Sequence, residues 1–199
     1  MGEFAAIVLA GGAGSRLGGP AKPTLAVAGR PMLERVLAAV ADASPRVVVG
    51  ASGVGLPADV TTVREEPAGG GPAAATAAGL SLINEDSEVV AVLAADLPLL
   101  TAGAIGVLRR RLIESTVDGA VYVDDHGRPQ TLCGVWRASP LRTAVHEFAA
   151  SRGGLTGASM AALLDGLRVA AVSWSRPSPP PWFDCDTDAD LRLAREWAR

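Results

Sequence analysis

A glycine-rich segment carrying two cations follows the first apolar run of the chain. Residues 9–22 hold repeated glycines together with Arg16 and Lys22. Glycines allow backbone N–H groups to approach a phosphate closely, and the two cations supply the positive charge that a triphosphate requires. Lys22 lies between Ala21 and Pro23, which is not the Gly-Lys-Ser/Thr arrangement of a Walker loop. The segment therefore predicts nucleoside triphosphate binding without P-loop ATPase chemistry.

Two other interpretations of this segment stay open. Gly12, Gly14 and Gly18 loosely resemble a dinucleotide-binding fingerprint, but the next predicted strand ends in residues 50–53 without an acid that could bind a ribose. This difference disfavours a nicotinamide-dependent oxidoreductase. The other alternative is a glycine turn that binds no ligand, and it leaves both cations without a role.

Three acidic residues could hold a metal ion. Asp96 follows the apolar run 88–94, and Asp184 and Asp186 alternate as strand residues do, so their side chains share a face. Mg²⁺ is usually bound through one or two carboxylates plus substrate phosphates. We therefore expect Mg²⁺ on Asp96 and Asp186, with Asp184 less favoured. The alternatives are a capping role for Asp96 and, for the other two, favourable charge at a helix N-terminus.

Periodic patterns predict the elements that must position these residues. The runs 4–9 and 88–94 are continuously apolar, as in parallel strands buried on both faces. Helical spacing begins after Pro31, and Thr187 and Asp190 have the spacing of a capping box at the start of the last helix. Further strands are expected over 46–50, 60–63, 119–123, 130–136 and 168–174, and further helices over 72–82, 102–114 with Thr101 as cap, 138–150 and 158–167.

This alternation predicts an α/β fold with a doubly wound, mostly parallel sheet and helices on both faces. The neighbouring strands at 119–136 are expected to form an antiparallel hairpin insertion. In such sheets ligands lie beyond the carboxyl ends of the strands, which is where the glycine-rich segment and Asp96 are expected.

Composition narrows the class of protein. The chain has 199 residues, of which 49% are hydrophobic and 20% charged, as expected of one globular domain over 1–199. A net charge of −3 gives no case for nucleic-acid binding, and residues 109–111, all arginine, are expected on a solvated helix face. No membrane span or signal peptide is expected, so we predict a cytoplasmic protein. Cys133 and Cys185 lack CxxC partners and are expected to be reduced, buried thiols.

Taken together, these motifs resemble the molybdenum cofactor guanylyltransferase family. The resemblance covers nearly the whole chain, and the segment beginning at Leu9 is its most specific part; the others are Gly71-Pro72, Asp96-Leu97-Pro98 and Asp184-Cys185-Asp186-Thr187. It implies a nucleotidyltransferase fold and the transfer of GMP from GTP to molybdopterin, a phosphorylated acceptor, with release of pyrophosphate. Mg²⁺ is the implied cofactor, and no nucleic acid or membrane is involved.

The resemblance also implies roles for individual residues. Lys22, Arg16 and Asp96 would be catalytic, Asp96 and Asp186 would hold the metal, and the backbone of 9–12 would contact guanine. The implied nucleotide-binding residues are Leu9, Ala10, Gly11, Gly12, Gly14, Ser15, Arg16, Lys22, Glu65, Gly71, Pro72 and Asp96. The acid before Gly71 could be Glu65 or Glu66. The acceptor is expected near the predicted hairpin and residues 151–157, where Arg152 could bind an anion or be an exposed loop arginine.

Departures from the family pattern keep the substrate open. Ala21 stands where the family usually has an acid, aspartates stand at 184 and 186 in place of asparagines, and Arg128-Pro129-Gln130 replaces a His-Pro pair. The glycine at Gly11 resembles the guanylyl branch, whereas the aspartates resemble cytidylyl relatives. The alternatives are therefore a cytidylyltransferase, another NTP transferase acting on a phosphorylated cofactor or sugar precursor, or a non-catalytic nucleotide-binding protein.

Overall fold

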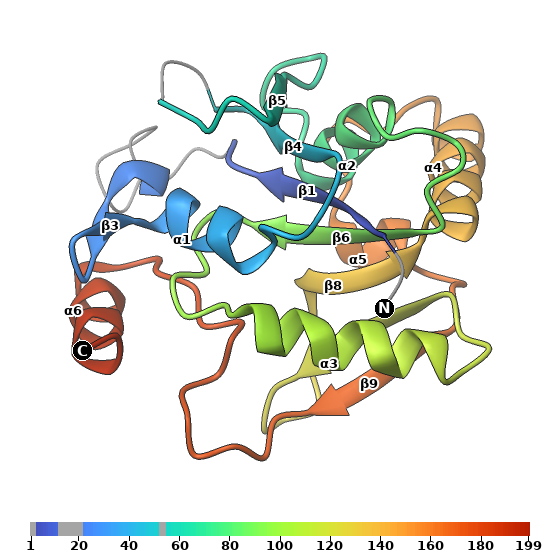
Figure 1. Cartoon of the computed structure of the whole chain (residues 1–199). Helices are drawn as coiled ribbons and strands as arrows, with labels where there is room; N and C mark the ends of the chain where they lie inside the picture. The colour runs from blue at the N-terminus through green and yellow to red at the C-terminus, as the bar shows by residue number, and fades with distance from the viewer. Residues whose placement is uncertain (1–2, 12–21, 52–54) are drawn as a thin grey trace.

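A computed structural model describes residues 3–11, 22–51 and 55–199. Within these residues, seven strands form one sheet in the order β5-β4-β1-β6-β8-β7-β9 (Figure 1). All neighbouring pairs are parallel except those made by β8, which runs antiparallel to both β6 and β7. The mostly parallel sheet with an antiparallel insertion is therefore confirmed. The strands are β1 (Ala5–Leu9), β4 (Arg46–Val49), β5 (Val60–Val63), β6 (Val89–Ala94), β7 (Gly119–Val123), β8 (Pro129–Arg137) and β9 (Val169–Ser173).

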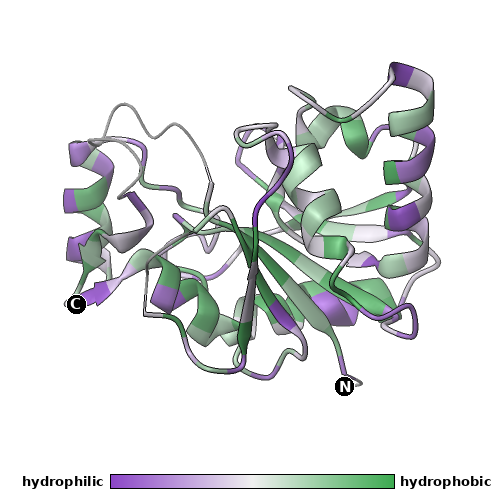
Figure 2. Ribbon diagram, turned by 90° about the horizontal axis from the view of Figure 1, so that it is seen from above, coloured by the Kyte–Doolittle hydropathy of each residue, from purple (hydrophilic) through white to green (hydrophobic). Residues whose placement is uncertain are grey.

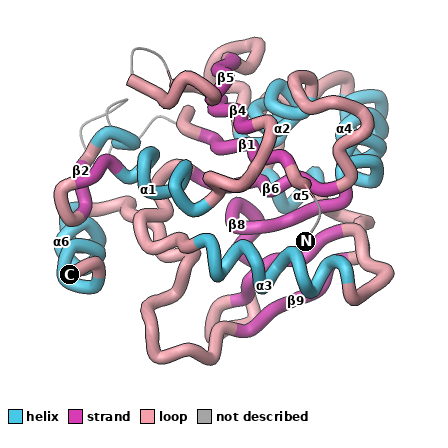
Figure 3. Tube along the Cα trace, in the orientation of Figure 1, coloured by secondary structure: helices cyan, strands magenta, loops and turns pink. Residues whose placement is uncertain are grey.

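Helices cover both faces of this sheet (Figure 3). On β1, Ala6 and Val8 join one core with α1 (Met32–Ala39) and α3 (Ala102–Ile113), whereas Ala5 and Ile7 face the other core. Because strand side chains alternate between faces, a strand that is apolar throughout supplies both cores. The second core is completed by α2 (Pro72–Leu80), α4 (Ala138–Arg152) and α5 (Met160–Leu163).

A smaller unit lies beside the main sheet. It combines the 3₁₀ turn η2 (Lys22–Thr24), the hairpin of β2 (Ala26–Val27) and β3 (Arg30–Pro31), and α6 (Asp188–Trp197). Leu191 and Ala194 of α6 are buried against Val27, Met32 and Cys185. The other side of α6 is hydrophilic (Figure 2). This packing brings Asp186, which lies just before α6, next to Lys22.

Most predicted elements are present, and the differences have local causes. Thr101 and Thr187 cap α3 and α6, and the capping box of Thr187 with Asp190 is complete. The helix expected over 158–167 is wrong in length, since α5 ends at Leu163 and the chain turns at Gly166 with φ of 92°. The β2–β3 hairpin was not predicted because two-residue strands carry no measurable period.

The surroundings of Arg109 and of the two cysteines bear on two further expectations. Arg109 does not belong to a solvated face: it is 5% exposed, lies 3.8 Å over the Phe4 ring and pairs with Asp42. The expectation of buried, reduced thiols is confirmed, and burial raises the pKa of both Cys133 and Cys185 to about 12. In the part of the chain that the structure describes, no helix is long and apolar enough to cross a bilayer.

Candidate active site

A pocket of about 650 Å³ opens at one edge of the main sheet. It lies beyond the carboxyl ends of β1 and β6 and beside the start of β8, which reaches the same edge because it runs antiparallel. This edge is where ligands bind in doubly wound sheets. The lining comes from segments 9–11, 22–23, 65–75, 94–97, 129–133 and 182–186.

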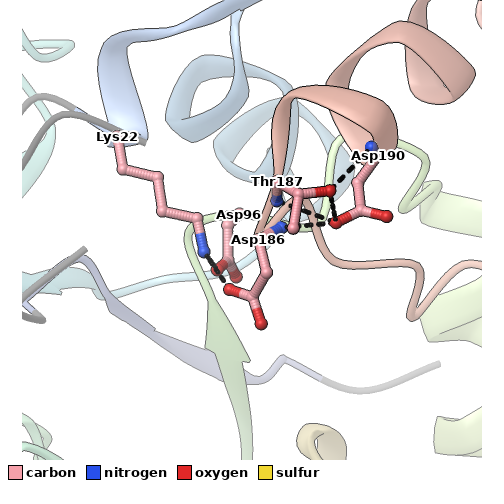
Figure 4. A network of polar contacts seen from close by, with 5 residues as sticks. All are labelled: Lys22, Asp96, Asp186, Thr187 and Asp190. Carbon is pink, nitrogen blue, oxygen red and sulfur yellow. Dashed lines mark hydrogen bonds and ion pairs between the residues drawn. The ribbon is translucent and has the colours of Figure 1, made fainter. Parts of the chain in front are cut away.

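Lys22 joins two carboxylates at the middle of the pocket (Figure 4). Its Nζ lies 2.5 Å from Oδ2 of Asp96 and 2.6 Å from Oδ1 of Asp186. Burial by itself lowers the pKa of Lys22, but the hydrogen bonds to Asp186 and Asp96 and their charges outweigh it, so the pKa is raised. The lysine is therefore a fully charged ammonium at neutral pH.

The last helix holds Asp186 in place. Oδ2 of Asp190 accepts hydrogen bonds from the backbone N–H of Asp186 at 3.1 Å and from the backbone N–H and hydroxyl of Thr187. The backbone N–H of Cys185 donates to the carbonyl oxygen of Asp96 at 3.2 Å. The two carboxylates are thus tied together through the backbone as well as through Lys22.

The two carboxylates suit a cation whose remaining ligands come from the substrate. No group of three or more His, Cys, Asp or Glu side chains that could hold a metal is found among the described residues. Mg²⁺ does not need such a group, because it binds through one or two carboxylates plus substrate phosphates and water. Asp96 and Asp186 already converge on the positive charge of Lys22, so their arrangement fits this kind of site.

Asp184 adds a third carboxylate to the same pocket. Its pKa is raised, first by desolvation and then by the negative charges of Asp186 and Asp96. The concentration of negative charge favours a bound cation at this place. Lys22 forms its ion pairs with Asp96 and Asp186, and the lesser metal role expected of Asp184 stays a prediction.

One end of the pocket is built mainly from backbone. Gly50, at the end of β4, has φ of 87°, and a Cβ on it would lie 2.6 Å from the Cα of Gly11. Gly71, which also has a positive φ, and Pro72 begin α2 at the pocket wall. Only glycine combines this conformation with such close contact.

Glu65 is a buried acid at that end. It is 6% exposed, and its Oε1 accepts a hydrogen bond from the backbone N–H of Gly69 at 3.0 Å. Its Oε2 has no hydrogen-bond partner among the described residues. A Cβ built on Gly11 would lie 3.4 Å from Oε1, so the carboxylate adjoins the first loop directly. A buried carboxylate oxygen without a partner is costly, and a ligand that donates to it removes that cost.

The structure brings most of the predicted site residues together. Gly12, Gly14, Ser15 and Arg16 lie outside the described residues. Of the two glutamates that were left open, Glu65 lines the pocket and Glu66 does not. The predicted residues that do line it are Leu9, Ala10, Gly11, Lys22, Glu65, Gly71, Pro72, Asp96 and Asp186.

Arg152 and Trp182 occupy different positions relative to the pocket. Arg152 is exposed, lies 5.7 Å from the Phe148 ring and does not line the pocket, so the expectation of an exposed arginine is the better one. Trp182, which was not a predicted site residue, lines the pocket and packs on Tyr122. Its position after a proline run carries no sequence signal for a binding site.

Comparison with known families decides the class of protein. The model of the MobA-like NTP transferase domain matches residues 6–168. The chain belongs to the MobA-like NTP transferase family. This MobA-like chain is 28% identical over 213 residues to the molybdenum cofactor guanylyltransferase of Rhodopseudomonas palustris (strain BisB5), covering 97% of this chain and 93% of that protein. The resemblance inferred from the motifs is confirmed, and the protein is a nucleotidyltransferase.

Solved structures share the fold of this MobA-like chain. Molybdopterin-guanine dinucleotide biosynthesis protein A from Archaeoglobus fulgidus matches with a TM-score of 0.73 and 21% identity over 97% of both chains. 2-C-methyl-D-erythritol 4-phosphate cytidylyltransferase from Thermus thermophilus matches with the same TM-score, 0.73, and 24% identity over 100% of both chains. The fold is thus shared with a molybdopterin-guanine dinucleotide biosynthesis protein and with a cytidylyltransferase, and it does not by itself select the substrate.

Proposed function

We propose that this nucleotidyltransferase transfers GMP from GTP to molybdopterin and releases pyrophosphate, with Mg²⁺ as the cofactor. The observation that carries the choice of nucleotide is the buried Glu65 carboxylate, which adjoins Gly11 and has one oxygen without a partner among the described residues. The 28% identity to a molybdenum cofactor guanylyltransferase over 97% of the chain supports the same choice.

A carboxylate at this position favours guanine for a chemical reason. Guanine presents two adjacent donors, the ring N1–H and the exocyclic amine, and a carboxylate can accept from both at once. Cytosine and adenine each place an acceptor next to their amine, which a carboxylate repels. Hydrogen bonds to charged groups contribute about 1.5–3 kcal/mol each, enough to select one base over another.

The centre of the pocket suits direct transfer of the GMP group to the acceptor, without a protein nucleophile. Cys133 is the thiol that lines the pocket, and its pKa of about 12 keeps it protonated at neutral pH. A phosphate oxygen of the acceptor would attack the α-phosphorus directly, and the bond to the β-phosphate oxygen would break as pyrophosphate leaves. Catalysis then consists of positioning and of neutralising charge.

Individual residues have separate tasks in this proposal. The ammonium group of Lys22 donates hydrogen bonds to the triphosphate and offsets its charge, together with Arg16. Asp96 and Asp186 would hold Mg²⁺, which when bound neutralises charge on the phosphate oxygens. The backbone at Leu9, Ala10 and Gly11 would contact the base, since glycine and small residues allow close approach.

The second candidate is cytidylyl transfer to a polyol phosphate. It is favoured by the aspartates at 184 and 186 and by the fold shared with the cytidylyltransferase from Thermus thermophilus. The two candidates differ in both base and acceptor, so one experiment separates them.

The test measures pyrophosphate release with each of GTP, CTP, ATP and UTP, offered with molybdopterin or with 2-C-methyl-D-erythritol 4-phosphate. We expect release only with GTP and molybdopterin, and only with Mg²⁺ present. Thermal unfolding gives an independent measure, because a ligand at 100 times its Kd adds about 2.7 kcal/mol of stability. For a chain of this size the Tm should rise by about 5–10 °C with GTP and Mg²⁺, and not in EDTA.

Each other outcome has a distinct meaning. Release with CTP and the polyol phosphate would move the protein to the cytidylyl branch. A Tm shift with GTP but no release with either acceptor would favour a non-catalytic nucleotide-binding protein. Absence of any shift would contradict the nucleotide site itself.

A further inference from the structure

The segments that line the pocket are arranged in a row, because they adjoin strands that lie side by side in the sheet. Glu65 follows β5, Gly11 follows β1, Asp96 follows β6, and Pro129 opens β8. These four strands are neighbours in the sheet apart from the intervening β4. Neighbouring strands lie about 4.8 Å apart, so β1 and β7 are separated by on the order of 14 Å. The carboxylates and Lys22 lie between the two ends. The base of the nucleotide, its phosphates and the acceptor would lie along the pocket in this order.

The far end of this row carries an aromatic stack. Trp182 packs on Tyr122 of β7 with ring centroids 5.1 Å apart and planes tilted by 30°, and Trp174 meets Tyr122 edge-on at 5.4 Å. Tyr122 is fully buried, and its hydroxyl donates to the carbonyl of Ala104 at 2.8 Å. Trp182 is half-buried and is the member of the stack that lines the pocket.

The indole of Trp182 is held before any ligand arrives. The backbone N–H of Phe183 donates to the carbonyl of Pro180 at 3.2 Å, which closes a turn with Trp182 inside it. Tyr122 supports one face of the indole, and the bond from Cys185 to the Asp96 carbonyl fixes the chain just beyond. A ring that is already ordered loses little entropy when a ligand stacks on it.

We infer that Trp182 is the stacking platform for a planar, fused-ring portion of the acceptor and thereby selects a pterin-type phosphate over a polyol phosphate. The inference rests on the proposed function, since it concerns the acceptor of that reaction. Stacking on an aromatic ring requires a ligand with a π-face, and a polyol has none. The phosphate of such an acceptor would extend from the ring toward Lys22 and the two carboxylates.

Two substitutions separate stacking from simple apolar contact. Trp182→Leu keeps an apolar side chain but removes the ring, and Trp182→Phe keeps a ring. We expect Trp182→Leu to raise the KM for molybdopterin by on the order of tenfold, and Trp182→Phe to change it by less than about threefold. The Kd for GTP with Mg²⁺ should be unchanged in both variants, because Glu65 and Gly11 lie at the other end of the pocket.

Fluorescence provides a readout that does not depend on turnover or on the folding of Trp182→Leu. The chain has four tryptophans, so the difference between wild type and Trp182→Phe reports on Trp182. Molybdopterin should quench this difference signal in the presence of GTP and Ca²⁺, added to slow the reaction.

The outcomes distinguish this inference from the proposed function. If the wild type turns over molybdopterin normally and the KM is unchanged in Trp182→Leu, the role of Trp182 alone is overturned. The same holds if molybdopterin does not quench the difference signal. Turnover of 2-C-methyl-D-erythritol 4-phosphate and not of molybdopterin would overturn both. The KM rise together with the quench supports the inference.

Discussion

The two ends of the pocket are made of different parts of the polypeptide. The end at β1 and β4 is formed by backbone, where Gly11 and Gly50 touch and Glu65 supplies a buried carboxylate. The end at β8 and β7 is formed by side chains, with Trp182 supported by Tyr122. Backbone geometry is set by the sheet, whereas side chains can be exchanged without disturbing it. In the proposed function, the end made of backbone would hold the nucleotide and the end made of side chains would hold the acceptor.

The largest effect is expected at the centre, which serves both ends. Asp96→Asn keeps the size of the side chain but removes a charge that pairs with Lys22 and would hold the metal. We expect kcat for pyrophosphate release to fall by about 100-fold or more, as when other charge-stabilising groups are removed from active sites. Asp86→Asn, on an exposed loop outside the pocket, is the matched control. Wild-type turnover in Asp96→Asn would contradict the assignment.

The base end can be tested through Glu65→Gln. The amide replaces one carboxylate oxygen with a donor, so the proposed pair of hydrogen bonds from guanine is lost. We expect the Kd for GTP to rise by about 10- to 100-fold, from the 1.5–3 kcal/mol of a hydrogen bond to a charged group. Glu66→Gln is the control, since Glu66 is exposed and does not line the pocket. Equal GTP affinities in the two variants would contradict the proposal that Glu65 binds guanine at this end of the pocket.

The close contact of backbone at that end can be tested through Gly50→Ala. Both Gly50 and Gly166 have positive φ, 87° and 92°, but a Cβ on Gly166 meets nothing within 4 Å. Gly166→Ala should lower the free energy of unfolding by about 1 kcal/mol through backbone strain. Gly50→Ala should lower it by about 3 kcal/mol, because its Cβ also collides with Gly11. Equal urea midpoints for the two variants would show that the contact is unimportant.

The smallest effect is expected where α6 holds the carboxyl-terminal part of the site. Asp190→Ala removes the acceptor of three hydrogen bonds from Asp186 and Thr187. We expect a loss of about 1 kcal/mol of stability, as for the loss of other hydrogen bonds that cap a helix N-terminus. Asp188→Ala is the control, since it removes a negative charge from the same helix turn and leaves the capping box of Thr187 and Asp190 intact.

The effect of Asp190 should depend on pH in a defined direction. The hydrogen bond from the Thr187 hydroxyl holds the pKa of Asp190 below its ordinary value of 3.8. The folded state therefore favours the ionised form, and its contribution is complete above pH 3.8 and is lost as pH falls through the lower, folded value. The stability gap between wild type and Asp190→Ala should be constant from about pH 5 to 7 and shrink below about pH 3.8. A gap that grows in acid would contradict this role.

Local sequence determined the elements and the chemical type of the site. The apolar runs around Ala5–Leu9 and Val89–Ala94 predicted buried parallel strands, and residues 9–11 and Asp96 lie at their carboxyl ends as expected. These features are readable because strand alternation, helix period and turn chemistry depend on residues close together in the chain.

Tertiary structure alone decided which distant residues meet. Lys22 and Asp186 are 164 positions apart and form an ion pair because α6 packs on the β2–β3 hairpin. The tertiary fold also put Glu65 in the pocket and Glu66 outside it, and it set Trp182 on Tyr122. No local pattern encodes such contacts, because they depend on the order of strands in the sheet and on how helices cover it. The sequence by itself therefore predicted an α/β protein that binds a nucleotide. The fold decided which residues lie at each end and at the centre of its pocket.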